Sequence, residues 1–196
     1  MQRRDVLRLL ASTPVAAGFA WTDAEASEAT QRATAARQAA PTAPFTPKFF
    51  TDHEYRTVRV LVDLIIPRDE RSGSASDAGV PEFMDFIVGD QPARQTAMRG
   101  GLAWLDRQCV TRFDKAFVAC AATEQTAVLD DIAWPERARP ELAAGVAFFN
   151  SFRDLTAAGF YTSKMGIDDL QYKGNTYVRT WTGCPDEACK KLGVSY

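Results

Sequence analysis

Apolar side chains recur at helical spacing through most of this chain, and that pattern limits its possible folds more than any other feature. The clearest case begins at Thr51, where Thr-Asp-His-Glu has the form of a capping box closed by Glu54. Four residues then place apolar side chains on one face of a helix: Val58, Leu61, Val62 and Ile65. Pro67 ends this helix. No segment shows sustained alternation of β-branched residues, so the chain is predicted to be all-α.

Further helices follow, each marked by apolar spacing and by a proline near one end. They are expected near Pro81, over residues 92–113, over 123–134, and from Pro140 to a glycine cap at Gly159. Gly100-Gly101 interrupts the second of these, at a cost of about 1 kcal/mol per glycine relative to alanine. Residues 68–78 are small and polar, which predicts a surface loop.

The N-terminal stretch has the composition of an export signal. Arg3 and Arg4 precede a mild apolar run over residues 9–21, which is shorter than the ~20 apolar residues that span a bilayer. Paired arginines before such a run predict a twin-arginine signal peptide over residues 1–26. It ends in the small-x-small sequence Ala24-Glu25-Ala26, although the cut position stays open. The alternative is an amphipathic helix of a cytosolic protein.

The rest of the chain divides into a linker and one domain. Residues 27–45 are rich in alanine, threonine and proline with almost no large apolar side chains, so they are predicted to be a linker. Residues 46–196 suffice for one helical domain. After Gly159 the chain becomes rich in glycine, aromatic and turn-forming residues, and only the part after Pro185 has a helical pattern. The prediction is a single helical domain with an irregular, aromatic-rich C-terminal region.

Charge and cysteine content limit the possible partners and the redox compartment of the chain. The formal net charge is −2, which gives no basic surface for nucleic acid. Four cysteines are present: Cys109, Cys120, Cys184 and Cys189. An exported chain meets an oxidising compartment, where an even cysteine count favours disulfides. Three pairings are possible, and the local one, Cys109–Cys120 with Cys184–Cys189, is preferred.

Motifs for catalysis, cofactors or metals are not found. The only histidine, His53, lies in the first turn of a capped helix and is expected to be solvated. No Cys-x-x-Cys, Cys-x-x-Cys-His or Gly-x-Gly-x-x-Gly occurs, which argues against zinc, haem c and dinucleotide sites. Asp130-Asp131 is expected on a solvated helix face. Asp168 and Asp169 are expected to accept hydrogen bonds in a turn, with a calcium or acid–base role as the alternative.

The lack of a cofactor motif is unexpected in a chain with this export signal. The twin-arginine route carries proteins that are already folded, often because a cofactor must be inserted first. Either the chain folds too fast for the unfolded-chain route, or it carries a cofactor-bearing partner with it.

Several segments resemble one known family. They are Phe49-Phe50 before the capped helix, Ile65-Ile66-Pro67 with Asp69-Glu70 after it, Ala78-Gly79-Val80-Pro81-Glu82-Phe83, Gly159-Phe160-Tyr161-Thr162-Ser163, Gly166, Tyr172-Lys173-Gly174-Asn175, Trp181-Thr182-Gly183-Cys184-Pro185 and Leu192-Gly193-Val194. Together they are similar to the gluconate 2-dehydrogenase subunit 3 family over residues 49–194, and the twin-arginine start belongs to the same pattern.

The resemblance implies a non-catalytic, chaperone-like small subunit of a periplasmic, flavin-dependent sugar dehydrogenase. FAD is then expected in the large partner, of the glucose–methanol–choline type, and not in this chain. Electrons would pass to a cytochrome c subunit or a related acceptor. Contact with the membrane would be indirect or through an uncleaved signal. The signal would serve a flavin subunit that has none of its own.

Two surfaces are candidates for the partner. The first is a set of aromatic residues in the irregular region: Phe160, Tyr161, Tyr172, Tyr177 and Trp181. Aromatic residues are enriched in the buried centres of interfaces, although these could instead fill a gap between helix ends. The second is the linker 27–45, which could fold on binding. The alternative functions are a stand-alone exported enzyme using His53, Asp168 or Asp169, and an exported binding or scaffold module.

Overall fold

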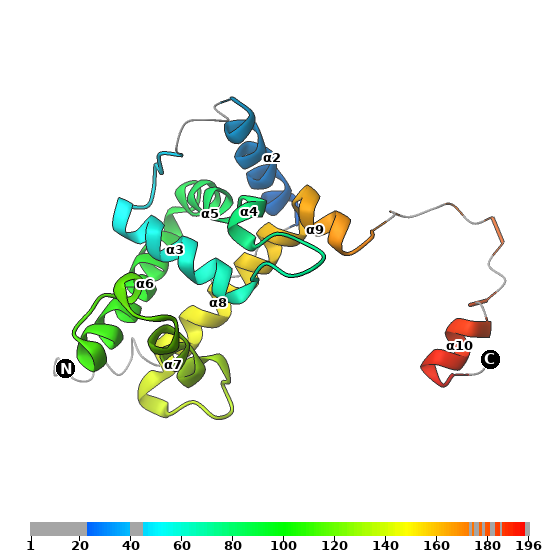
Figure 1. Cartoon of the computed structure of the whole chain (residues 1–196). Helices are drawn as coiled ribbons and strands as arrows, with labels where there is room; N and C mark the ends of the chain where they lie inside the picture. The colour runs from blue at the N-terminus through cyan, green and yellow to red at the C-terminus, as the bar shows by residue number, and fades with distance from the viewer. Residues whose placement is uncertain are drawn as a thin grey trace, which may run out of the picture.

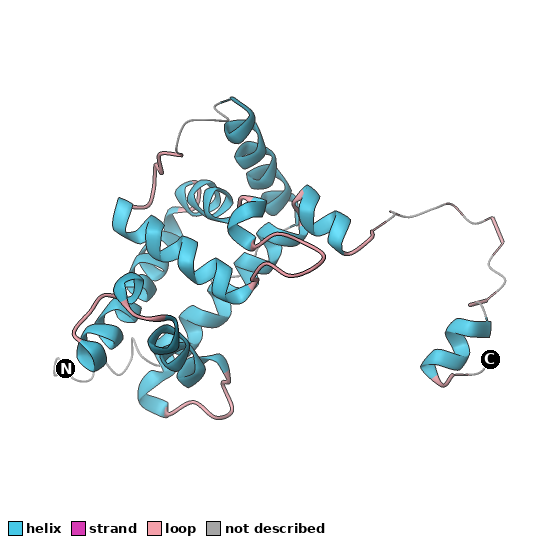
Figure 2. Cartoon of the chain, in the orientation of Figure 1, coloured by secondary structure: helices cyan, strands magenta, loops and turns pink. Residues whose placement is uncertain are grey.

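The computed structural model describes residues 23–39, 45–172, 174, 177, 179–180, 183–184 and 186–194. No strand occurs in these ranges, and the all-α prediction is confirmed (Figure 2). The α-helices are α2 (Asp23–Ala39), α3 (Asp52–Ile65), α4 (Ala75–Ala78), α5 (Val80–Gly89), α6 (Pro92–Phe113), α7 (Ala122–Ala133), α8 (Ala143–Tyr161), α9 (Lys164–Asp169) and α10 (Asp186–Leu192). Two short 3₁₀ helices are η2 (Phe117–Ala119) and η3 (Pro140–Leu142).

The core gathers around two helices. α8 contacts α5, α6 and α7 along its length, and α9 follows at its C-terminal end (Figure 1). α5 is mostly apolar and almost wholly buried, with Glu82 and Asp85 buried among its apolar residues, so it needs neighbours all round it. Those neighbours are α2, α3, α6 and α8. The largest fully buried side chains are Phe83, Phe117, Phe152 and Phe160.

Local signals placed most helices correctly. The capping box is present at the start of α3, where the Thr51 hydroxyl accepts from the Glu54 amide and the Glu54 carboxylate accepts from the Thr51 amide at 2.8 Å. The predicted helix over 92–113 is α6 to the residue. The helix over 123–134 is α7, shifted by one residue.

Three local predictions were wrong. Gly159 does not cap α8, which continues to Tyr161; a Cβ at Gly159 would lie 2.6 Å from the Phe83 ring, so the glycine allows close packing. The predicted loop 68–78 contains the short helix α4, which Ser74 caps. The C-terminal region, predicted irregular before Pro185, contains α9, which Ser163 caps.

The predicted linker differs most from the structure. Residues 23–39, which cover the end of the predicted signal and most of the linker, form α2. Ala26, Ala29 and Ala33 are buried and join the core. Alanine buries little area, but its small side chain lets one helix approach another closely, and α2 covers one side of apolar α5 (Figure 1). Arg3 and Arg4 lie outside the described residues.

None of the helices in the described ranges has both the length and the apolar content required to cross a membrane.

Candidate functional site

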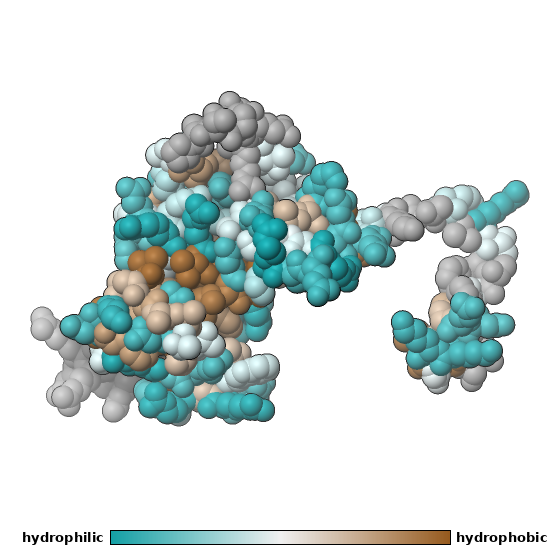
Figure 3. Space-filling view, viewed as in Figure 1, coloured by the Kyte–Doolittle hydropathy of each residue, from teal (hydrophilic) through white to brown (hydrophobic). Residues whose placement is uncertain are grey.

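A groove of about 750 Å³ opens on the surface of the described residues. It lies between α2, the loop before α4, the start of α5 and α9. Its lining comes from four parts of the chain: Thr30, Ala33 and Thr34; Arg71, Ser72, Gly73, Asp77, Ala78, Gly79 and Phe83; Gly159; and Ser163, Lys164, Met165, Asp168 and Asp169. The loop at the edge of the groove presents mainly hydrophilic residues at the surface (Figure 3). The groove therefore joins segments that lie far apart in the sequence.

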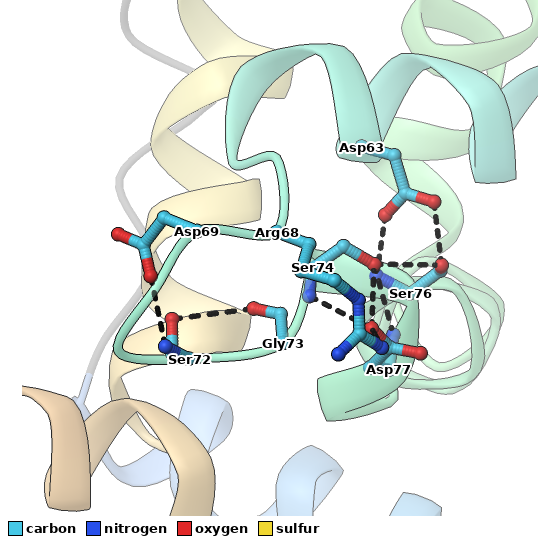
Figure 4. Close-up of polar contacts among 8 residues, drawn as sticks. All are labelled: Asp63, Arg68, Asp69, Ser72, Gly73, Ser74, Ser76 and Asp77. Atoms are coloured by element: carbon cyan, nitrogen blue, oxygen red, sulfur yellow. Dashed lines mark hydrogen bonds and ion pairs between the residues drawn. The ribbon is translucent and has the colours of Figure 1, made fainter.

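Carboxylates order the loop that forms one wall. The Asp69 carboxylate accepts from the amides of Arg71 and Ser72, each at 2.8 Å. The Asp77 carboxylate accepts from the Ser74 amide at 2.8 Å and pairs with Arg68 at 2.6 Å (Figure 4). These contacts give a polar loop of this length one defined conformation.

The same hydrogen bonds shift the pKa values of two carboxyl groups. Backbone amides of Ser72 and Arg71 hold the pKa of Asp69 below its ordinary value. The Ser74 amide is the largest cause of the lowered pKa of Asp77, with Arg68 adding to it. Both side chains stay ionised at neutral pH.

α3 and α5 fix the loop at its C-terminal end. The Asp63 carboxylate on α3 accepts from the amide and the hydroxyl of Ser76, at 2.7 and 2.6 Å (Figure 4). Gly79 joins α4 to α5 at φ 91°, a left-handed conformation that favours glycine. The Ala78–Phe83 segment of the family resemblance thus forms the turn between α4 and α5, which holds the loop beside α9.

The opposite wall carries charges of both signs. Arg71 donates to the Asp169 carbonyl and lies 3.4 Å from its carboxylate, so it bridges the groove. Lys164 and Asp168 form an ion pair at 2.5 Å along α9. Asp168 and Asp169 therefore lie at the groove in ion pairs.

His53 is not simply solvated, which corrects the sequence prediction. Its Nε2 lies 2.6 Å from the Asp106 carboxylate, and the other oxygen of Asp106 accepts from the Phe117 amide at 2.9 Å. The pair ties α3 to α6 and η2, and neither residue lines the groove. Asp131, expected on a solvated face, pairs with Arg112 at 2.6 Å. In the part of the chain that the structure describes, no cluster of three or more His, Cys, Asp or Glu side chains could hold a metal ion.

The aromatic candidates divide into two groups. Phe160 is 1 % exposed and fills the core, so its prediction as an interface residue was wrong and the alternative, packing between helices, holds for it. Tyr161, Tyr172 and Tyr177 are exposed. Trp181 lies outside the described residues.

All four cysteines are thiols in the structure, and their pairing as disulfides stays a prediction. Cys109 and Cys120 are buried and interact with one another. Burial, with Cys120 alongside, raises the pKa of the Cys109 thiol to about 12. Cys184 precedes α10 and Cys189 lies within it, and both are half-buried.

Sequence reasoning missed two structural side chains. Arg71 was read only as part of a polar loop. Asp85 is 1 % exposed on α5, where its carboxylate accepts from the amides of Lys48, Phe49 and Phe50. An acid between Met84 and Phe86, in a helix of mostly apolar residues, was a signal that could have revealed it, because a buried charge needs partners.

The described part of the chain is an all-helical protein, and the groove between α2, the loop before α4 and α9 is its candidate site. A comparison with protein families matches residues 52–180 to gluconate 2-dehydrogenase subunit 3. The chain belongs to this family, the accessory subunit of a dehydrogenase, as its sequence resemblance predicted. The matched range includes the loop wall and α9, whereas α2 and α10 lie outside it. Comparisons with curated proteins and with solved structures found no match.

Proposed function

We propose that this chain is the non-catalytic small subunit of a periplasmic sugar dehydrogenase, and that it supports the maturation, stability and export of a flavin subunit. The family match over residues 52–180 carries this proposal. The flavin subunit is of the glucose–methanol–choline type and holds the FAD. A cytochrome c subunit or a related acceptor takes the electrons.

The export signal supports a role as carrier. Arg3 and Arg4 mark the chain for a route that moves folded proteins. A flavin subunit must fold around its cofactor before export, so a signal on its small partner would bring both across together.

The surface beside the groove supports contact with a large partner. Tyr161 at the end of α8 and Tyr172 after α9 are 42 % and 61 % exposed, and Ile167 and Leu170 add apolar area between them. Tyrosine offers a large contact area at low entropic cost, which suits the centre of an interface.

The carrier role is tested by replacing both arginines, Arg3→Lys with Arg4→Lys, in cells that also make the flavin subunit. Dehydrogenase activity is expected to stay in the cytoplasm, whereas Arg8→Lys, the same change outside the pair, should leave export intact. Periplasmic activity at the wild-type level in the double variant would contradict the carrier role.

The accessory role is tested by assaying the purified chain on sugars with an artificial electron acceptor, with and without the flavin subunit. Turnover should require the partner. Turnover by this chain alone, with no bound flavin, would instead favour a stand-alone enzyme.

A further inference from the structure

The predicted signal peptide and the folded domain overlap. The small-x-small sequence Ala24-Glu25-Ala26, the expected cut site, lies in the first turns of α2. Ala26 is 3 % exposed. Proteolysis concentrates at exposed termini and loop tips, because the cut segment must be accessible and free of local structure. In the folded chain Ala24 and Ser27 are exposed, but Ala26 is buried and the whole site is helical, so it is not free of local structure.

Buried alanines hold α2 in place. Ala26, Ala29 and Ala33 lie on one face, at positions i, i+3 and i+7, and are 3 %, 5 % and 4 % exposed. This face packs along α5, which is mostly apolar and would otherwise expose that side to water (Figure 1).

Polar contacts fix α2 at several points along its length. Gln91 donates to the Glu25 carboxylate at 2.7 Å, within the expected cut site itself. Thr30 and Thr162 hydroxyls lie 2.7 Å apart and join α2 to the end of α8. Arg32 pairs with Asp90 just beyond α5. The Gln91–Glu25 contact must break before the first turn of α2 can unwind, and the other two contacts hold the following turns against the domain.

From this packing we infer that the exported chain is not cut after Ala26 and keeps the whole of α2, so that any processing falls before Asp23. The order of events rests on the proposed function: a chain exported in the folded state has α2 in place before it meets a peptidase outside the cytoplasm. Retention of α2 also preserves one wall of the groove, which Thr30, Ala33 and Thr34 supply.

The first test reads the N-terminus of the exported protein. The full chain is expressed with its flavin subunit, recovered from the periplasm, and analysed by intact mass and N-terminal sequencing. The N-terminus is expected at or before residue 23. A mature chain that begins at Ser27 would overturn the inference.

The second test does not depend on export. The full chain, purified in folded form from the cytoplasm, is incubated with purified bacterial signal peptidase beside a synthetic peptide of residues 17–33. Cleavage of a protected site follows the population of the open form, so the folded chain should be cut after Ala26 at least about tenfold more slowly than the peptide. Equal rates would overturn the inference, even if the arginine variants confirm the carrier role.

Matched variants test whether the packing of α2 against the domain protects the site after Ala26 from cleavage. Ala29→Asp places a charge on the buried face and should raise cleavage toward the rate of a peptide with the same substitution. Ala35→Asp makes the same change at an exposed position of the same helix and should leave protection unchanged.

Gln91→Ala removes the partner of Glu25 from outside the signal and should raise cleavage in a chain whose circular dichroism and melting stay close to wild type. If Ala29→Asp does not fold, Gln91→Ala decides. Wild-type protection in a folded variant of either kind would overturn the inference.

Discussion

Asp85 joins the segment before α3 to the buried helix α5. Its carboxylate accepts from the amides of Lys48, Phe49 and Phe50 at 2.8, 2.9 and 2.9 Å. Asp85→Ala leaves these amides without their acceptor and should lower the free energy of unfolding by about 2–4 kcal/mol, measured by urea unfolding. Asp85→Asn should lose less because its amide oxygen still accepts. Asp130→Ala, at an exposed position, should stay within about 0.5 kcal/mol, and a loss at Asp85 no larger than this would contradict the assignment.

Cys109 shows how burial controls the chemistry of a single thiol. Its pKa of about 12, raised by burial and by Cys120, leaves almost no thiolate near neutral pH, and the thiolate is the reactive form. In the reduced, folded chain, iodoacetamide at pH 8 should modify half-buried Cys184 and Cys189 at least about tenfold faster than Cys109. Peptide mapping by mass spectrometry measures the rates, and unfolding in urea should remove the difference. Rapid labelling of Cys109 in the folded chain would show that the site is open.

Two adjacent glycines in α6 have opposite roles in that helix. A Cβ at Gly101 would lie 1.9 Å from the Phe148 ring, whereas a Cβ at Gly100 meets nothing within 4 Å. Gly101→Ala should therefore lower the free energy of unfolding by about 1–3 kcal/mol by overpacking against α8. Gly100→Ala should raise it by about 1 kcal/mol, because alanine favours the helix. Urea unfolding of the two variants measures both effects, and equal effects would contradict the packing of α6 on α8.

The loop before α4 should loosen in acid. Asp69 and Asp77 have lower pKa values in the folded chain than in the unfolded chain, because backbone amides donate to the ionised carboxylates. Each therefore stabilises the fold at pH values above its unfolded pKa, and this contribution is lost as the pH falls through the folded-state pKa.

A non-titrating variant tests this acid sensitivity. Between pH 6 and about pH 3, wild type should lose more thermal stability than Asp77→Asn, since asparagine does not titrate. Asp154→Asn, at an exposed position on α8, serves as the control and should lose as much as wild type. Melting temperatures followed by circular dichroism supply the comparison. Equal losses in wild type and Asp77→Asn would mean that this carboxylate contributes nothing to the folded state.

At the scale of the whole molecule, the exposed aromatic residues beyond α8 test the partner surface. Tyr161→Ser with Tyr172→Ser should lower the amount of flavin subunit that copurifies with the chain about tenfold, as expected for interface tyrosines. Trp134→Ser removes an aromatic side chain that is 58 % exposed at the end of α7 and should have little effect. Equal yields from both variants would place the interface elsewhere.

Sequence alone determined the class of fold, most helix positions and the family. Caps, prolines and apolar spacing act over a few residues, so Thr51 with Glu54 and Pro92 to Phe113 could be read directly. The family motifs around Gly79 and Gly159 could be read without knowing that both reach one groove.

Tertiary structure decided whatever depends on distant neighbours. The alanines of α2 look unable to form a core until α5 is seen to need a cover on that side, and Thr30 bonds Thr162 from 132 positions away. Phe160 and Gly159 likewise take their roles from the packing of α8 against its neighbours. Whether a side chain lies in the core, in the groove wall or on the surface depends on which helix packs against it. That helix comes from a distant part of the chain, so the residues around the side chain do not reveal it.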